Sequence, residues 1–548
     1  MSAPSLTPYV REEFSAEETD ILRRYVTNVE GPCFALVNLP EVVKGALFAR
    51  YSRTHKSLRR LFLDEFVGDL DIEGDTAIDA TVGLDRAERL YEKVFLEYGD
   101  DSVAQLGGVH LACEQASNLL TKILEWGRLM SYLEQSTRYI AYDARLGGRY
   151  RYYRDPELLA SPLGTRYVGD MDRLFDTYAA LVPLVQEWCR QRYPKSPSDS
   201  DFVHRQSTRA KALDAVRGVL PAASLSNVGI YGAGQGYEAL LLRMRAHPLA
   251  EARAYAELML HELRKVIPSF LSRVDRPERG GEWTSYLRTT REDTAGVAAS
   301  LLAGTGPSDE DTPEVTLVDF DPDGEDKVLA AMLYPHADQP EQRLLERVRS
   351  MSGTERSALV AAYVGARGNR RHKPGRALER TAYRFDVCTD YGAFRDLQRH
   401  RMLTIQWQAL SPRHGYVMAD DVMAAGAATP FEEAMATSAA LHDALEGPFP
   451  AQASYAVCLG YRLRYSMELN ARSALHMLEL RTSPAGHPSY RRICQDMHHL
   501  IATQAGHRIV AGLMRFVDHS EAGTGLERLP GERRAEARRA VPPGKAST

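Results

Sequence analysis

Residues 242–253 read LRMRAHPLAEAR, and residues 478–492 read LELRTSPAGHPSYRR. Both stretches begin with the pattern Leu-x-apolar-Arg. In both, His-Pro and then a further arginine follow, and the sequence continues with helical spacing. Repetition of this kind is what a tandem duplication produces. Two unrelated amphipathic helices would give the same short pattern, so both interpretations are open on this observation alone.

The length and composition describe a large globular protein. The chain has 548 residues, which corresponds to roughly three to four domains or to two larger units. Apolar residues make up 44% and charged residues 26%, as is usual for a globular chain. The net charge of −5 argues against a protein whose whole surface attracts nucleic acid or an anionic membrane. A local basic pocket for a phosphate remains compatible with it.

The cysteines and the N-terminus exclude several classes of protein. The six cysteines include no CxxC pair, so a zinc ribbon, a thioredoxin-like site and a disulfide framework are not indicated, and we expect no metal site. The first residues are polar and acidic, without the apolar region of a signal peptide. Because no apolar run reaches about 18 residues, a membrane span is not expected. We predict a cytoplasmic location.

Hydrophobic periodicity predicts a chain rich in helices, with a few strands. Helical spacing is found at 110–126, 165–191, 236–266 (with a break at His247-Pro248), 325–334, 340–350, 432–446 and 470–515. Strands are predicted at Val315–Phe320 and within 379–394. Residues 1–20 are expected to be loose, and residues 526–548 to form a disordered tail.

Two segments look like boundaries. Residues 303–326 contain Gly, Pro and nine acidic residues between Asp309 and Asp326, without Lys or Arg. This segment predicts either a linker or an ordered hairpin. Residues 365–376, GARGNRRHKPGR, are basic and rich in Gly and Pro, and are hard to place inside a regular element.

Two clusters of polar residues could bind an anion. The first runs from Ser131 to Tyr139 and brings hydroxyls, a carboxylate and an arginine together where a long helix is expected to pass into a loop. A helix end followed by a polar turn would look the same. The second is Arg399-His400-Arg401, with Arg395 one helical turn before Arg399. Solvent or an acidic neighbour could balance these charges, and a bound pyrophosphate is the sharper hypothesis.

Two further stretches are weaker signals. Asn470 is a natural N-cap for a helix that carries Arg472 and Arg481, and a capped amphipathic helix accounts for most of that stretch. Arg217-Gly-Val-Leu-Pro221 places a cation beside an apolar strand or turn and says little by itself.

Taken together, these clusters resemble the flavin-dependent thymidylate synthases. The signature of that family begins with Arg-His-Arg and ends with a Ser-x-Arg-Tyr loop. The first half of the chain has the end of the signature, Ser131–Tyr139, and reads Trp126-Gly127-Arg128 where the beginning should stand. The second half has the beginning, Arg399–Arg401, but Ala409 and Ser411 replace the serine and arginine of the loop.

The resemblance extends over most of the chain. His372 and Glu379 look like the His…Glu pair that precedes the signature, and residues 99–105 are its altered counterpart in the first half. The Arg-x-Val-Leu-Pro segment is kept at 217–221, whereas Ser454 replaces its arginine in the second half. The Asn-Ala-Arg helix is kept at 470–481 and altered at 233–236. The resemblance implies an α+β fold with two fused copies, 20–290 and 313–525, each with a mixed or antiparallel sheet and long helices, joined by a linker at 291–312.

The losses in the two copies are complementary. The family builds its sites from several subunits of a tetramer, so the resemblance implies composite sites that use residues of both copies. It also implies a homodimer that forms a pseudo-tetramer of four domains. The alternative is that both copies have decayed and that the complementarity is accidental.

The resemblance implies reductive methylation of dUMP to dTMP, with methylenetetrahydrofolate and NADPH as co-substrates and FAD as the redox group. The implied FAD-binding residues are Arg399, His400, Arg401, His372, Glu379, Asn470, Arg472 and Glu134. The implied nucleotide-binding residues are Ser136, Thr137, Arg138, Arg217, Arg395 and Arg481. Of these residues, Arg399, Arg481, Ser136 and Arg138 are implied to take part in catalysis, and Arg481 to stabilise negative charge on the uracil.

Several departures from the family leave alternatives open. Asp396 stands where the family often carries glutamine near the substrate, Trp126-Gly127 removes one flavin side, and Trp407-Gln408 alters the loop after Arg401. The site could therefore act on another uridine nucleotide, or the protein could bind flavin or nucleotide without catalysis. Nucleic-acid binding through 365–376 or the arginine-rich tail fits the net charge poorly.

Overall fold

The computed structural model describes residues 9–67, 107–305 and 313–539, and these form two compact units. The first unit comprises 1–179, 220–309 and 436–457, and the second comprises 180–219, 310–435 and 458–548. Each unit thus contains a segment from the other half of the sequence. The altered His…Glu counterpart at 99–105 lies outside the described residues.

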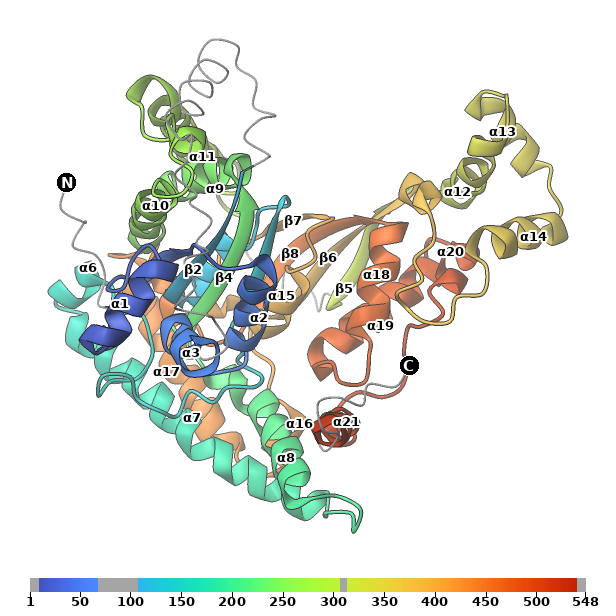
Figure 1. The fold of residues 1–548 in the computed structure, drawn as a ribbon. Helices are drawn as coiled ribbons and strands as arrows, with labels where there is room; N and C mark the ends of the chain where they lie inside the picture. Colours follow the sequence, from blue (N-terminus) through green and yellow to red (C-terminus); the bar gives the residue numbers. More distant parts are fainter. Residues whose placement is uncertain (1–8, 68–106, 306–312, 540–548) are drawn as a thin grey trace. The chain divides into compact units, whose positions relative to one another are not determined.

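Each unit contains a four-stranded antiparallel sheet, and the two sheets share one strand order. Figure 1 labels β2 and β4 of the first sheet and β5 to β8 of the second. The first has the order β1-β2-β4-β3, with β1 Cys33–Leu36, β2 Gly108–Ser117, β3 Met130–Glu134 and β4 Leu225–Ala233. The second has the order β5-β6-β8-β7, with β5 Val315–Phe320, β6 Ala382–Asp390, β7 Thr404–Trp407 and β8 Arg462–Asn470. The predicted α+β duplication is confirmed by this repeated topology.

Both units also contain helices, some of which pack on the strands. The first unit contains α1 Ala16–Tyr25, α2 Glu41–Tyr51, α3 Leu58–Glu65, α5 Asn118–Leu124, α6 Pro156–Ala160, α9 Gly234–Arg245, α10 Ala250–Leu263 and α11 Glu282–Leu301. The second contains α8 Asp201–Val216, α12 Gly324–Leu333, α13 Glu341–Arg349, α14 Gly353–Val364, α15 Tyr391–Leu397, α16 Asp420–Ala424, α18 Ala471–Arg481, α19 Pro488–Thr503, α20 Arg508–Leu513 and α21 Leu529–Arg539. Residues of both units belong to α7 Gly164–Arg192 and α17 Ala428–Glu446.

The helix predicted at 110–126 is wrong. Its first part is the central strand β2, and only the short helix α5 follows. The Ser117 hydroxyl accepts a hydrogen bond from the Leu120 N–H at 3.0 Å, so it ends the strand and caps the helix. A short apolar run with small residues fits the periodicity of a helix and that of a strand equally well. Here the pairing with β4 makes the segment a strand. For the same reason Ser131–Glu134 belongs to strand β3 rather than to the end of a long helix.

Three segments that were expected to be loose, disordered or a linker contain helices. In the region expected to be loose, α1 begins at Ala16, and Ser15 and Glu18 form a reciprocal capping box. The expected tail contains α21 up to Arg539, and residues 540–548 lie outside the described part. The predicted linker 291–312 is helical as far as Leu301. That the two copies meet in this segment remains a prediction.

The basic segment 365–376 is anchored rather than a boundary. Arg367 is buried, and its guanidinium bonds both carboxylate oxygens of Glu479 on α18 at 2.8 and 2.7 Å. It also donates to the carbonyl oxygens of Leu513 at 2.7 Å and His372 at 2.6 Å. These contacts fix the segment on α18. In the described ranges, no helix combines the length and the apolar character that a membrane crossing requires.

A buried carboxyl group in the first unit makes stability depend on pH. Glu251 accepts hydrogen bonds from Ser117 N at 2.8 Å, Ser117 Oγ at 2.6 Å and Tyr455 Oη at 2.7 Å. Burial nevertheless raises the pKa of Glu251 from 4.5 to about 7. Between these values the folded state binds the extra proton, so stability is lost as the pH rises.

We therefore expect Glu251→Gln to reduce the fall in unfolding free energy between pH 5 and 8 by about 3 kcal/mol. Urea unfolding of both proteins across that range measures the difference. Identical pH slopes in the two proteins would contradict this assignment.

Candidate active site

The Arg-His-Arg triplet lies in the second unit, between α15 and β7. Asp390 ends β6 and caps α15, because its Oδ1 accepts a hydrogen bond from the Ala393 N–H at 2.9 Å. Arg395 is buried on this short helix, and Arg399 to Arg401 are half-buried just after it. The strand, the cap and the helix together place these cationic groups at one end of the sheet.

Arg217, from the first half of the sequence, lies against the same helix within the second unit. Its Nη1 is 3.4 Å from Asp396 Oδ2, and its Nη2 is 3.9 Å from Asp390 Oδ1. A Cβ placed on Gly392 would lie only 3.1 Å from the Arg217 guanidinium, so the absence of a side chain there lets the two pack closely. A residue from one half thus enters the site of the other half.

Arg481, at the end of α18, reaches the same carboxylate. Its Nη1 is 3.4 Å from Asp396 Oδ1, and its guanidinium lies 5.4 Å from the centre of the Tyr490 ring. Asp396 therefore bridges Arg217 and Arg481. The sequence singled out all three residues, and the structure brings them together.

His400 is a hydrogen-bond acceptor in this site. Arg481 Nε donates to His400 Nε2 at 2.9 Å, which requires that nitrogen to be deprotonated. Burial, followed by the charges of Arg481 and His476, holds the pKa of His400 well below its ordinary value. His400 is therefore neutral at pH 7.

His476 extends the site along α18. Its ring centre is 5.7 Å from that of His400. Burial, then the charges of Lys373, Arg370 and Arg481, lower the pKa of His476. The mutual repulsion of these cations indicates a local excess of positive charge, which suits an anionic ligand.

The remaining predicted FAD-binding residues of the second half lie beside this cluster. Asn470 caps α18 by accepting a hydrogen bond from the Ser473 N–H at 2.9 Å. Arg472 contacts Glu379 at 3.3 Å and the Pro374 carbonyl at 3.1 Å. His372 accepts a hydrogen bond from the Gly368 N–H at 3.1 Å. Arg472 and Glu379 therefore meet where the anchored basic segment reaches α18, and Asn470 caps the same helix.

The predicted residues Ser136, Thr137 and Arg138 lie in the first unit, in the loop after β3. The Ser136 hydroxyl accepts a hydrogen bond from the Arg138 N–H at 3.2 Å, and Thr137 and Arg138 are largely buried. Glu134 is buried 3.1 Å from Lys122 Nζ, so it already belongs to an internal ion pair. The structure thus groups Arg217 with second-half residues, whereas Ser136–Arg138 belong to the other unit.

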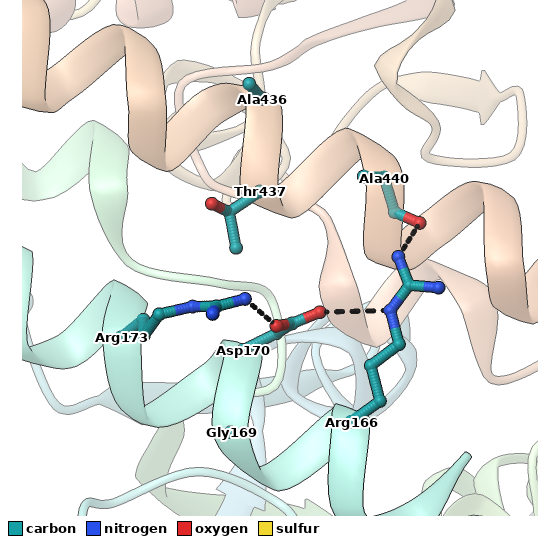
Figure 2. A pocket seen from close by; sticks show the side chains of 7 residues that line it. All are labelled: Arg166, Gly169, Asp170, Arg173, Ala436, Thr437 and Ala440. Carbon is teal, nitrogen blue, oxygen red and sulfur yellow. Dashed lines mark hydrogen bonds and ion pairs between the residues drawn. The ribbon is translucent and has the colours of Figure 1, made fainter.

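An open hollow of about 560 Å³ in the first unit contains none of the predicted residues (Figure 2). In Figure 2, Arg166 of α7 donates to the Ala440 carbonyl of α17 at 2.9 Å, and Asp170 lies between Arg166 and Arg173. Because Arg166 and Arg173 both already pair with Asp170, we assign no ligand to the hollow.

Three residues of the site were missed at the level of sequence. Asp390 precedes a short helix, as an N-cap does, but nothing indicated that it also faces Arg217. His476 lies four residues after Arg472 and five before Arg481 and could have been suspected from that spacing. The role of Gly392 follows only from the position of Arg217.

The sequence matches the Thy1 family, described as thymidylate synthase complementing protein, at residues 49–269 and again at 316–505. A UPF0159 protein of Chlamydia muridarum is 40% identical over 96% of this chain and 99% of its own length. A UPF0159 protein of Thermoplasma acidophilum is 30% identical over 87% of this chain and 95% of its own.

Two solved structures share low identity with the chain. The flavin-dependent thymidylate synthase of Helicobacter pylori, complexed with FAD and dUMP, is 16% identical, covering 34% of this chain and 93% of its own, with a TM-score of 0.27. A UMP/dUMP methylase of Streptomyces cacaoi, bound with 5-Br dUMP, is 16% identical, covering 37% and 97%, with a TM-score of 0.29. From the two family matches, the near full-length relatives and the repeated sheet, we conclude that the chain belongs to the flavin-dependent thymidylate synthase family and carries two diverged copies of its domain in tandem.

Proposed function

We propose that the protein catalyses the reductive methylation of dUMP to dTMP, with methylenetetrahydrofolate as the carbon donor and NADPH as the reductant. The observation that carries this proposal is the meeting of Arg217 with Asp396 and Arg481 in one unit. A site made of residues from both halves is what complementary losses in two copies require. Family membership supplies the class of reaction.

The residues around His400 fit FAD in their chemistry. The diphosphate of FAD is anionic, and Lys373, Arg370 and Arg481 already raise the local positive charge at His476. Arg399, His400, Arg401, His372, Glu379, Asn470 and Arg472 would hold the flavin. The role predicted for Glu134 stays a prediction, because in the first unit its carboxylate pairs with Lys122. FAD would supply the redox chemistry when bound, while the protein orients the partners.

The nucleotide would be held mainly by arginines. Ser136, Thr137, Arg138, Arg217 and Arg395 are proposed to bind the phosphate and sugar, and Arg481 to stabilise negative charge on the uracil. His400 fixes Arg481 by accepting its Nε–H, so that Nη1 is directed toward Asp396. We also propose a homodimer in which four copies form a pseudo-tetramer, in the cytoplasm.

Asp396 favours a second candidate, a methylase of a different uridine nucleotide. A carboxylate between two arginines changes the charge and the hydrogen bonds offered to the substrate. Comparing product formation from dUMP and UMP, each with methylenetetrahydrofolate and NADPH, separates the two. Formation of dTMP that requires dUMP, methylenetetrahydrofolate and NADPH together supports the first proposal. A methylated product from UMP but not from dUMP, under the same conditions, supports the second.

FAD binding is tested by visible absorption spectra of the purified protein with and without added FAD. We expect the wild type to bind FAD and Arg399→Ala to bind it about tenfold or more weakly, the loss expected for one charge-assisted hydrogen bond. Arg384→Ala is the control, because Arg384 forms an exposed ion pair with Glu468 on the sheet surface. A wild-type protein that binds no FAD would overturn the enzymatic proposal.

A further inference from the structure

We propose that Arg528 is a positioning residue of the nucleotide site: from the C-terminal arm, residues 518–539, it holds the last turn of α8 and, through that turn, the guanidinium of Arg217. The inference rests on the proposed function, because Arg217 is one of the arginines assigned to the phosphate and sugar of the nucleotide. The arm lies beyond the second family match, which ends at residue 505. The family relationship alone therefore assigns this arm no role.

The arm is attached to both ends of α8, and its own helix α21 packs against α8 (Figure 1). Just before α8 begins, Arg533 Nη2 is 2.8 Å from Asp199 Oδ2. In the last turn of α8, Asp214 Oδ2 lies 2.5 Å from Arg528 Nη2. Two arginines of one arm thus pair with carboxylates at opposite ends of one helix, and each pair can be removed without the other.

The pair of Arg528 and Asp214 stabilises the last turn of α8. A carboxylate in the last turn of a helix is disfavoured, because the C-terminal end of the helix dipole is negative. Arg528 offsets this charge. The side chains of Arg528 and Asp214 are only 9% and 13% exposed, so solvent ions screen their attraction little. Without Arg528, we expect the turn to loosen three residues before Arg217.

Arg217 depends on the position of this turn. It ends α8, where its N–H donates to the Leu213 carbonyl. Its side chain is 4% exposed and its guanidinium packs on Gly392, so the forked group has little room to readjust when the backbone shifts. Its Nη2 is buried and has no hydrogen-bond partner among the described residues, which leaves that donor for a ligand oxygen. Because a misplacement of about 1 Å can cost about a hundredfold in rate, loosening of the turn should weaken this contact.

A second route leads from the same turn to the other side of Arg217. His487 Nε2 donates to the Asp214 carbonyl at 3.2 Å, because its Nδ1 already accepts the Ser489 N–H at 3.3 Å. The Ser489 hydroxyl in turn donates to Asp390 Oδ2. The other oxygen of Asp390 lies 3.9 Å from Arg217 Nη2. A shift of the last turn of α8 therefore reaches the guanidinium through its backbone and through the carboxylate beside it.

The test compares Arg528→Ala with Arg533→Ala in the full-length protein loaded with FAD. Arg533→Ala is the matched control, because it removes the same kind of ion pair at the opposite end of α8. By isothermal titration calorimetry, we expect the Kd for dUMP to rise about tenfold in Arg528→Ala and to stay at the wild-type value in Arg533→Ala. The Kd for FAD should be unchanged in both variants, because a displaced Arg217 affects the nucleotide and not the flavin.

Asp214→Asn removes the same ion pair from the other side, and it replaces Arg528→Ala if that protein does not fold. It should weaken dUMP binding about as much, and the double variant should bind dUMP no more weakly than either single variant. Equal losses of dUMP affinity in Arg528→Ala and Arg533→Ala overturn the inference. Wild-type dUMP affinity in a folded Arg528→Ala protein does so too.

Hydrogen exchange of the protein without nucleotide distinguishes this inference from the proposed function. Mass spectrometry of a peptide that covers residues 210–219 should show faster amide exchange in Arg528→Ala than in the wild type, and no change in Arg533→Ala. Faster exchange in a protein that binds no dUMP would support the positioning of Arg217 while refuting the proposed function. Exchange of that peptide at the wild-type rate in Arg528→Ala overturns the inference.

Discussion

Arg217→Ala is expected to lower kcat/KM for dUMP by about a thousandfold, because it removes two or more charge-assisted hydrogen bonds to the nucleotide. Arg217→Lys should recover only a small part of the activity, since an ammonium group keeps the charge but not the forked donor geometry. The effect is large because the guanidinium is buried, and water cannot replace it there. Initial rates of dTMP formation measure it.

The control for this prediction is Arg209→Ala, an exposed arginine two turns earlier on α8. It should retain wild-type activity. Removal of Arg217 also leaves Asp390 and Asp396 without their buried cation, so folding of the variant is checked by circular dichroism and thermal unfolding. A folded Arg217→Ala protein with wild-type kcat/KM would remove Arg217 from the site.

The largest expected effect on stability is that of Arg367→Ala. The side chains of Arg367 and Glu479 are each 1% exposed and joined by two hydrogen bonds. Without Arg367, Glu479 would be left as a buried, unpaired charge, which costs about 3–5 kcal/mol. The loss should appear as a lower midpoint in urea unfolding. It should also weaken FAD binding, because Arg367 anchors the segment that carries His372 and Lys373.

A double variant, Arg367→Met with Glu479→Met, tests whether the loss of stability comes from the unpaired charge of Glu479. Apolar replacement of both partners removes the unpaired charge, so most of the lost stability should return. Arg347→Ala is a surface control, because the pair that Arg347 forms with Glu355 is exposed to solvent. If Arg367→Ala unfolds at the wild-type urea concentration, the buried pair has no part in holding the segment.

Strong local patterns in the sequence predicted much of the fold. The helices α7, α10, α12, α13 and α17 and the strands β5 and β6 were found from periodicity, and His247-Pro248 correctly marked the break between α9 and α10. Strand β2 was mistaken for a helix because its apolar residues are closely spaced and include small side chains. Only its pairing with β1 and β4 identifies it as a strand.

The sequence named the residues of the cluster around Asp396, but it did not predict which of them lie together. Motifs identified Arg217, Asp396, His400 and Arg481, yet Arg217 was assigned with Ser136–Arg138. Its actual neighbours follow from the inclusion of residues 180–219 in the second unit, a long-range feature of the fold. The sequence signalled Asp396 only as a departure from the family, because the distance between two arginines cannot be read from their positions in the chain.

The central claim is that residues from both halves form one nucleotide site, and a double-mutant cycle on dUMP binding tests it most directly. Calorimetric titration of the wild type, Arg217→Ala, Arg481→Ala and the double variant gives the interaction free energy between the two arginines. We expect both single variants to bind dUMP weakly and the double variant to differ from their sum by about 1 kcal/mol or more. Additive effects, or dUMP affinity unchanged by Arg217→Ala, would contradict the claim.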